Sequence, residues 1–208
     1  MDEAEARRRL DVPRETLERL EAFVALLHEE NASQNLVSKA SLESVWERHI
    51  LDSAQLIRFA PPEARSWLDL GTGAGFPGLL VPLFHEARVT LVESRRLRVD
   101  FLRTAASVLD VAEKVEIHCL KLESVPARPF DVISARAFAP LPRLLALAER
   151  FSTSGTVWIL PKGRNAKSEL EAARSSWQGD FRLEPSLTDA EAQIVVASGV
   201  RQKPRGRR

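Results

Sequence analysis

Apolar residues in the first part of the chain recur at helical spacing. From residue 14 to about 30 they return every three or four positions, and Pro13 stands where the first turn of a helix tolerates proline. The same period continues from residue 42 to 57, until the proline pair at 61–62 ends it. We therefore predict a helical N-terminal attachment over residues 1–62.

Beyond this segment, short apolar runs alternate with helical stretches. The runs typical of buried strands are WLDL, VTLVE, VEIHC, FDVIS and TVWIL. This alternation predicts parallel strands joined by crossover helices that cover both faces of a sheet. The last two runs, FRLEPSL and AQIVVAS, are separated by a link too short for a crossover helix, so they predict an antiparallel hairpin. We therefore predict an α/β core over residues 63–200, with a mostly parallel sheet closed by this hairpin.

The first predicted strand runs directly into a glycine-rich turn, GTGAGFPG. Glycine permits a positive φ at a tight strand-to-helix turn and lets a ligand approach bare backbone. Gly73, Gly75 and Gly78 fit the G-x-G-x-x-G fingerprint of dinucleotide-binding proteins, which leaves a dinucleotide-dependent oxidoreductase open. Gly71, Gly73 and Gly75 fit a second pattern, G-x-G-x-G, in which Asp69 precedes the first glycine.

Asp69 favours a ligand that carries an ammonium group and no phosphate, since a carboxylate repels the pyrophosphate that backbone N–H groups would otherwise hold. S-adenosylmethionine is such a ligand. Glu93 ends the second predicted strand, where an acid can accept hydrogen bonds from ribose hydroxyls. Leu122 and Glu123 follow the third predicted strand, so we expect them at the adenine.

Composition and charge narrow the class of protein. The 208 residues are 44% hydrophobic and 28% charged, which is typical of a globular protein. The net charge is +1, but the segment 201–208, RQKPRGRR, holds five basic groups and no acid. We expect a flexible basic tail there that attracts polyanions, although a solvated end without a role is equally compatible.

Other classes lack their sequence signals. No apolar run is long enough to cross a membrane, and the N-terminus has no secretory signal. The single cysteine, Cys119, cannot form an internal disulfide, so we expect a buried thiol in a cytoplasmic protein. The four histidines are scattered, so we expect no metal site. Nothing in the sequence requires more than a monomer.

Several motifs, in this order along most of the chain, resemble those of the RsmG (GidB) family of bacterial 16S rRNA guanine-N7 methyltransferases. They are NLVS at 35–38, ERHILDS at 47–53, LDLGTGAGFPG at 68–78, LVES followed by RVDFL at 91–102, ISARAFAPL at 133–141 and LPKG at 160–163. The glycine motif alone is generic for class I methyltransferases, whereas the motifs before and after it are specific. The resemblance implies a class I, Rossmann-like methyltransferase fold.

The resemblance also implies contacts and a reaction. S-adenosylmethionine would meet Gly71 and Phe76 in the turn, the pair Leu122–Glu123, and Arg136 after the fourth strand. The methyl group would pass to N7 of one guanine in the decoding-region hairpin of 16S rRNA, within free rRNA or the small ribosomal subunit. N7 is a neutral lone pair, so we expect alignment of the reactants and no catalytic acid or base.

Candidate RNA contacts are polar or basic residues that the motifs place near the crevice. They are Asn35, Arg48, His49, Arg136, Lys162 and Arg164. Phe138 is placed either to stack on a splayed base or to pack at the start of a helix. Two further functions stay open, an RNA-binding ribosome-assembly factor that keeps the fold without catalysis, and a small-molecule methyltransferase.

Overall fold

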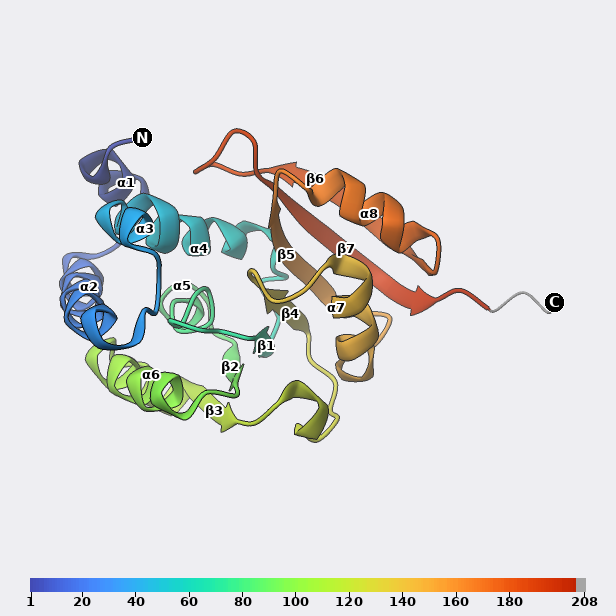
Figure 1. Ribbon diagram of the computed structural model, residues 1–208, viewed down its shortest axis with the longest axis horizontal. Coiled ribbons are helices and arrows are strands. Elements are labelled where there is room, and N and C mark those ends of the chain that lie inside the picture. The colour runs from blue at the N-terminus through green and yellow to red at the C-terminus, as the bar shows by residue number, and fades with distance from the viewer. Residues whose placement is uncertain (205–208) are drawn as a thin grey trace.

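A seven-stranded sheet runs through the molecule in the computed structural model, which describes residues 1–204 (Figure 1). The strands are β1 (Ser66–Leu70), β2 (Arg88–Glu93), β3 (Val115–Cys119), β4 (Val132–Ala135), β5 (Val157–Gly163), β6 (Trp177–Pro185) and β7 (Gln193–Gln202). Their order in the sheet is β3-β2-β1-β4-β5-β7-β6. The first five strands are parallel, and β7 lies antiparallel to both β5 and β6. The predicted mostly parallel sheet with a C-terminal hairpin is confirmed.

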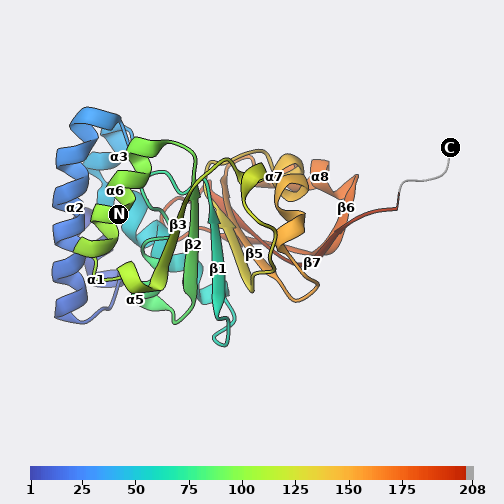
Figure 2. The same cartoon turned by 90° about the horizontal axis from the view of Figure 1, so that it is seen from below.

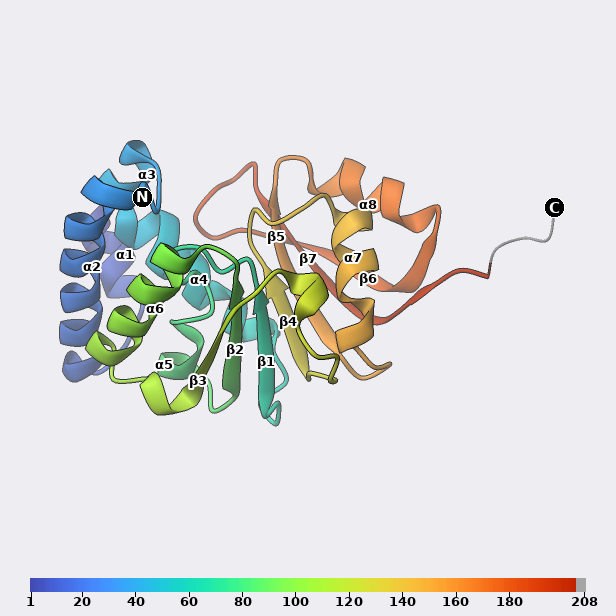
Figure 3. The same ribbon diagram turned by 60° about the horizontal axis from the view of Figure 1, so that its bottom comes forward.

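Helices cover both faces of the sheet (Figures 2 and 3). They are α1 (Glu3–Arg9), α2 (Arg14–Gln34), α3 (Lys39–Glu43), α4 (Asp52–Ala54), α5 (Val81–Phe84), α6 (Arg96–Val108), α7 (Leu141–Ala148) and α8 (Ala166–Arg174). A π-helical turn, η1 (Trp46–Leu51), leads into α4, and the 3-10 turn η2 (Gln55–Phe59) follows it. Shorter 3-10 turns are η3 (Ala112–Lys114), η4 (Leu122–Ser124) and η5 (Glu149–Phe151).

The N-terminal helices share a hydrophobic core with one face of the sheet. Phe23 of α2 packs edge-on against Phe76 of the glycine turn, with ring centroids 5.6 Å apart, and also against Phe101 of α6. Trp67 and Val89 point into this core from β1 and β2, while the alternate residue Leu68 points into a second core under α7 and α8. The period-2 alternation of each strand therefore fills two cores.

The C-terminal strand is longer than the sequence predicts. β7 continues to Gln202, which pairs with Trp177 of β6, and Arg201 pairs with Gln178. The Lys203 N–H then donates to the Ser176 carbonyl at 2.8 Å. Residues 201 and 202 of the predicted tail therefore belong to β7, and residues 205–208 lie outside the described part of the chain.

The expectation of a buried thiol is wrong, because Cys119 is exposed. It is the last residue of β3, which is the edge strand of the sheet and has a neighbour on one side only. In residues 1–204 no helix is long and apolar enough to span a membrane. Within the same residues, no group of three or more His, Cys, Asp or Glu side chains is placed to hold a metal ion.

Candidate functional site

The glycine turn after β1 has the backbone conformation that its composition predicts. Gly71, Gly73 and Gly75 have φ values of +63°, +58° and +94°, a region that glycine adopts without steric cost. The Gly71 N–H donates to the Val92 carbonyl at 2.9 Å, which ties the turn to the end of β2. A Cβ atom at Gly71 would lie 2.4 Å from Cδ2 of Phe138, so this glycine also allows an aromatic ring to approach the backbone.

Asp69 lies beneath the turn instead of facing a ligand. The Ser134 hydroxyl donates to Oδ1 at 2.6 Å, and the Gly78 N–H donates to Oδ2 at 3.2 Å. The carboxyl group is fully buried, and burial raises its pKa to about 6. We predicted a direct contact between Asp69 and an ammonium group. In the structure, the Asp69 side chain instead links β1 to β4 and to the glycine turn by these two hydrogen bonds.

A cavity of about 460 Å³ opens at the carboxyl ends of β1, β2 and β3, within the usual size of ligand pockets. Gly71, Glu93, Leu122 and Glu123, all predicted cofactor contacts, line it together. Glu93 is buried, its Oε1 accepts from the Arg95 N–H at 2.9 Å, and its Oε2 lies 3.6 Å from Arg98. Leu122 is buried in η4, whereas the side chain of Glu123 is exposed.

Besides Asp69, three predicted cofactor contacts do not line this cavity: Gly73, Phe76 and Arg136. Gly73 stands in the turn, where a Cβ atom would lie 3.7 Å from Nη1 of Arg98 and would clash with nothing. Phe76 is buried in the core, where its ring stacks on the imidazole of His49 with centroids 4.8 Å apart and an interplanar angle of 13°. Phe76 therefore supports His49 from below.

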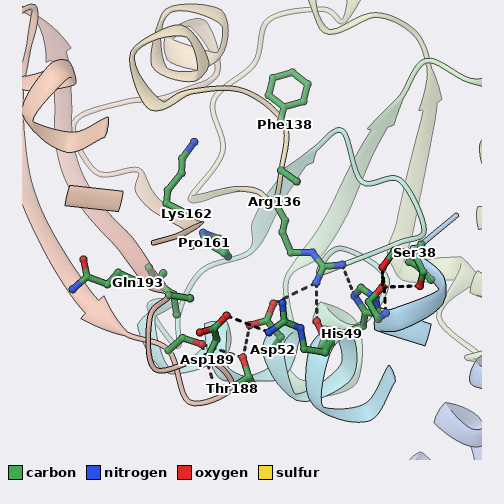
Figure 4. A pocket seen from close by; sticks show the side chains of 18 of the residues that line it. Ser38, His49, Asp52, Arg136, Phe138, Pro161, Lys162, Thr188, Asp189 and Gln193 are labelled. Carbon is green, nitrogen blue, oxygen red and sulfur yellow. Dashed lines mark hydrogen bonds and ion pairs between the residues drawn. The ribbon is translucent and has the colours of Figure 1, made fainter. Parts of the chain in front are cut away.

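Arg136 connects the end of β4 to the N-terminal helices (Figure 4). Its Nη2 donates to Nδ1 of His49 at 2.8 Å, and its Nη1 lies 3.3 Å from Oδ2 of Asp52 and 3.1 Å from the Arg48 carbonyl. Because a guanidinium only donates, Nδ1 of His49 accepts and Nε2 carries the proton. Burial, and then the charges of Arg136 and Arg48, lower the pKa of His49 to about 3. His49 is therefore neutral at physiological pH.

These groups line a second cavity of about 800 Å³, bounded by η1, the ends of β4 and β5, and the connection between β6 and β7. Of the predicted RNA contacts, four line this cavity: Arg48, His49, Arg136 and Lys162. The other two do not. Asn35 is exposed and ends α2 in a left-handed conformation with φ of +49°, and Arg164 is exposed and lies 3.1 Å from Glu191.

Lys162 is not a free cation in the larger cavity. Its ammonium group donates to the Ala139 carbonyl at 2.6 Å and lies 3.1 Å from Oε2 of Glu169, and only 7% of its side chain is exposed. Glu169 of α8 also accepts from the Leu141 N–H at 2.7 Å. The pair therefore holds the segment between β4 and α7. Sequence reasoning missed Glu169, because nothing in the local pattern of α8 marks it.

The segment 137–140 lines both cavities and is where they meet. Ala137 has φ of +52°, which is uncommon for a residue with a Cβ atom. Phe138 points away from Arg136 and packs over Gly71 (Figure 4). The arrangement leaves room for one ligand beside the glycine turn and for a second in the larger cavity, with this segment between them.

Solved structures share this fold. An O-methyltransferase from Bacillus cereus in complex with SAH superposes with a TM-score of 0.58 over 85% of this chain and 90% of that one, at 16% identity. A TehB-like SAM-dependent methyltransferase from Corynebacterium glutamicum has a TM-score of 0.58 over 83% and 98%, at 17% identity. At such identities the similarity shows the fold alone, and it confirms the predicted class I methyltransferase fold.

Relatives in sequence are much closer. Residues 16–193 match the family described as rRNA small subunit methyltransferase G. A protein of Rhizorhabdus wittichii named Ribosomal RNA small subunit methyltransferase G is 53% identical over all of this chain and 98% of its own length. Its namesake in Zymomonas mobilis is 48% identical over 93% of this chain and 90% of its own length. The chain therefore belongs to the rRNA small subunit methyltransferase G (GidB) family.

Proposed function

We propose that this protein transfers a methyl group from S-adenosylmethionine to N7 of one guanine in the decoding-region hairpin of 16S rRNA. Membership of the family supports the cofactor and the rRNA substrate. Two adjoining cavities at the carboxyl edge of the sheet support a reaction between two bound molecules. The choice of N7 rests on the acid–base groups of the larger cavity, namely its hydrogen-bonded carboxylates and the weakly basic His49.

The smaller cavity fits the cofactor. Gly71 offers bare backbone, Glu93 a buried carboxylate at the end of β2, and Leu122 an apolar wall. These residues would hold the ribose and the adenine, which need hydrogen-bond acceptors and apolar contact respectively. When bound, S-adenosylmethionine supplies an electrophilic methyl group on its sulfonium.

Every carboxylate that lines the larger cavity is already engaged by donors of the protein. The pairs are Asp52 with Gln55 and Thr188, each at 2.8 Å, Glu169 with Lys162 and the Leu141 N–H, and Asp189 with Arg48 and the Glu191 N–H. The lowered pKa of His49 makes its imidazole a weak base near pH 7. A ribose hydroxyl would need a general base, whereas the lone pair of guanine N7 needs none.

The residues of the larger cavity would therefore act by position. Arg136 is fixed by His49 and Asp52, and the segment that separates the cavities is fixed by Lys162 and Glu169. A fixed wall of this kind lets the cavity hold a base in one orientation, and orientation of two reactants can lower a barrier by up to roughly 7–11 kcal/mol.

The test is methyl transfer from labelled S-adenosylmethionine to small ribosomal subunits from cells that lack this gene, with the position mapped by N7-specific strand scission. One 7-methylguanine in the decoding-region hairpin is the expected result. Cofactor binding without transfer to subunits, to assembly intermediates or to free rRNA would refute the proposal and favour a binding role. We also propose a monomer, since one chain completes both cavities, and sedimentation at micromolar concentration checks this.

A further inference from the structure

The cations of the larger cavity are neutralised by acids of the same protein. The three that line it are Arg48, Arg136 and Lys162. They lie 3.2 Å from Asp189, 3.3 Å from Asp52 and 3.1 Å from Glu169. A phosphate approaching this cavity meets as many negative as positive charges. The larger cavity is therefore suited to a neutral base and poorly suited to the RNA backbone.

The mouth of the smaller cavity has the opposite character. Arg95, Lys121 and Arg143 line it, and all three are exposed. Within residues 1–204, none of their side chains has a hydrogen bond or an ion pair with another residue. A fourth cation, Arg98, faces Glu93 at 3.6 Å. Against Arg95, Lys121 and Arg143 stands one exposed acid of the same lining, Glu123, so the mouth keeps a net positive charge that attracts anions.

The three cations are spread along the edge of the sheet. Arg95 follows β2, Lys121 follows β3, and Arg143 lies in the first turn of α7, which follows β4. Strands β3 and β4 are separated by β2 and β1. With about 4.8 Å between neighbouring strands, this edge spans roughly 14 Å. Groups that start from positions spread over that width suit successive phosphates of a nucleic acid strand better than a single phosphate ion.

We propose that Arg95, Lys121 and Arg143 form a phosphate-binding rim, on which the rRNA backbone crosses the mouth of the cofactor cavity while the target base enters the larger cavity, an inference that rests on the proposed function. The rim recognises phosphate and carries no base specificity. RNA bound there covers the cofactor cavity, so S-adenosylmethionine binds before the RNA does.

The test compares two triple variants with equal loss of charge. The carboxyl-edge variant is R95Q/K121Q/R143Q. The control, the amino-edge variant, is R65Q/R88Q/K114Q, which changes cations next to the opposite ends of β1, β2 and β3. Three readouts are taken for each full-length protein and the wild type. They are affinity for small ribosomal subunits from cells lacking the gene at salt concentrations from about 50 to 200 mM, affinity for S-adenosylmethionine by calorimetry, and methyl transfer.

We expect the carboxyl-edge variant to bind subunits more weakly and with less salt dependence. Each lost phosphate contact lowers the slope of log K against log salt by about 0.7–0.9, so three lower it by about 2–3. Raising the salt from about 50 to about 200 mM lowers the affinity of both proteins for subunits. The factor by which it does so is roughly 20 to 40 times smaller for the variant than for the wild type. The amino-edge variant keeps the wild-type slope, and all three proteins keep the same affinity for S-adenosylmethionine.

Two results would refute the proposal of a phosphate-binding rim. Equal salt slopes for the two variants would show that the charges act only through net charge, and a loss of S-adenosylmethionine affinity in the carboxyl-edge variant would show that they serve the cofactor. Failure of the proposed function looks different. In that case the wild type itself transfers no methyl group, while its salt slope still reports on the rim.

Discussion

Acidification should destabilise this protein through one buried side chain, His49. Only 7% of this residue is exposed, its ring stacks on Phe76, and its Nδ1 accepts from Arg136. A proton on Nδ1 would remove that acceptor and set an imidazolium against a guanidinium. The folded protein therefore resists protonation of His49, and the unfolded chain does not.

The magnitude follows from the two pKa values. Burial and the neighbouring arginines lower the pKa of His49 from 6.5 to about 3 in the folded state. Between these values the unfolded chain binds more protons, so the free energy of unfolding falls as the pH falls below 6.5. At pH 5 the loss is about 2 kcal/mol, since each pH unit below 6.5 contributes about 1.4 kcal/mol. Above pH 7, where His49 is neutral in both the folded and the unfolded state, none of this stability is lost.

Urea denaturation at pH 8 and pH 5 measures this loss, with His49→Phe as the comparison. Phenylalanine keeps a ring over Phe76 but cannot titrate, and it loses the hydrogen bond from Arg136, so at pH 8 the variant is less stable by roughly 1.5–3 kcal/mol. At pH 5 we expect the stability difference between the wild type and the variant to shrink by about 2 kcal/mol. Only the wild type loses the His49 contribution, and the other titrating groups are common to both proteins. His28→Gln, a change of an exposed residue of α2, is the control. A gap that stays constant with pH would refute the reasoning.

Four further predictions concern the site. Glu93→Ala should weaken S-adenosylmethionine binding roughly 10- to 100-fold, because a charged acceptor is lost, and unchanged affinity in calorimetry would remove Glu93 from the site. Lys162→Met should lower turnover about tenfold while leaving affinity for small subunits intact, since its ammonium group holds the Ala139 carbonyl; an equal fall in affinity would indicate a phosphate contact instead. Asp69→Asn should gain about 2 kcal/mol of stability relative to the wild type between pH 4 and pH 7 in urea denaturation, because burial raises the pKa of Asp69 from 3.8 to about 6 and the folded wild type loses stability as the pH rises through that range; a pH-independent difference would contradict this. Deleting residues 204–208 should weaken binding to small subunits and flatten its salt dependence without shortening β7, and equal binding at low salt would show that this segment has no role.

Much of the fold could be predicted because its signals are local. The change of period after residue 62 marks where helices give way to a sheet, and the short link before AQIVVAS forces a hairpin. That Glu93 and Leu122 lie at one cavity could be predicted for a related reason. Each stands at or just beyond the end of a strand, and the carboxyl ends of parallel strands meet at one edge.

The misplaced residues are those whose surroundings come from distant parts of the chain. Lys162 was expected to face RNA, but it meets Glu169 of α8 and a carbonyl beyond β4. Asn35 is exposed and ends α2 in a left-handed conformation, which asparagine tolerates, and its contact with RNA stays a prediction. Cys119 was expected to be buried, but the strand order leaves β3 at an edge.

The sequence by itself determined the period of each element, the positive φ angles of the glycine turn and the family, because each of these depends on residue types at short spacing. Only the tertiary structure decided which charges are neutralised. Arg136 is fixed by His49 and Asp52, whereas Arg143, only a few residues later, remains without a side-chain partner among residues 1–204. A charge acts over a few ångströms in space, and the chain brings acids to one cavity that no spacing along the sequence reveals.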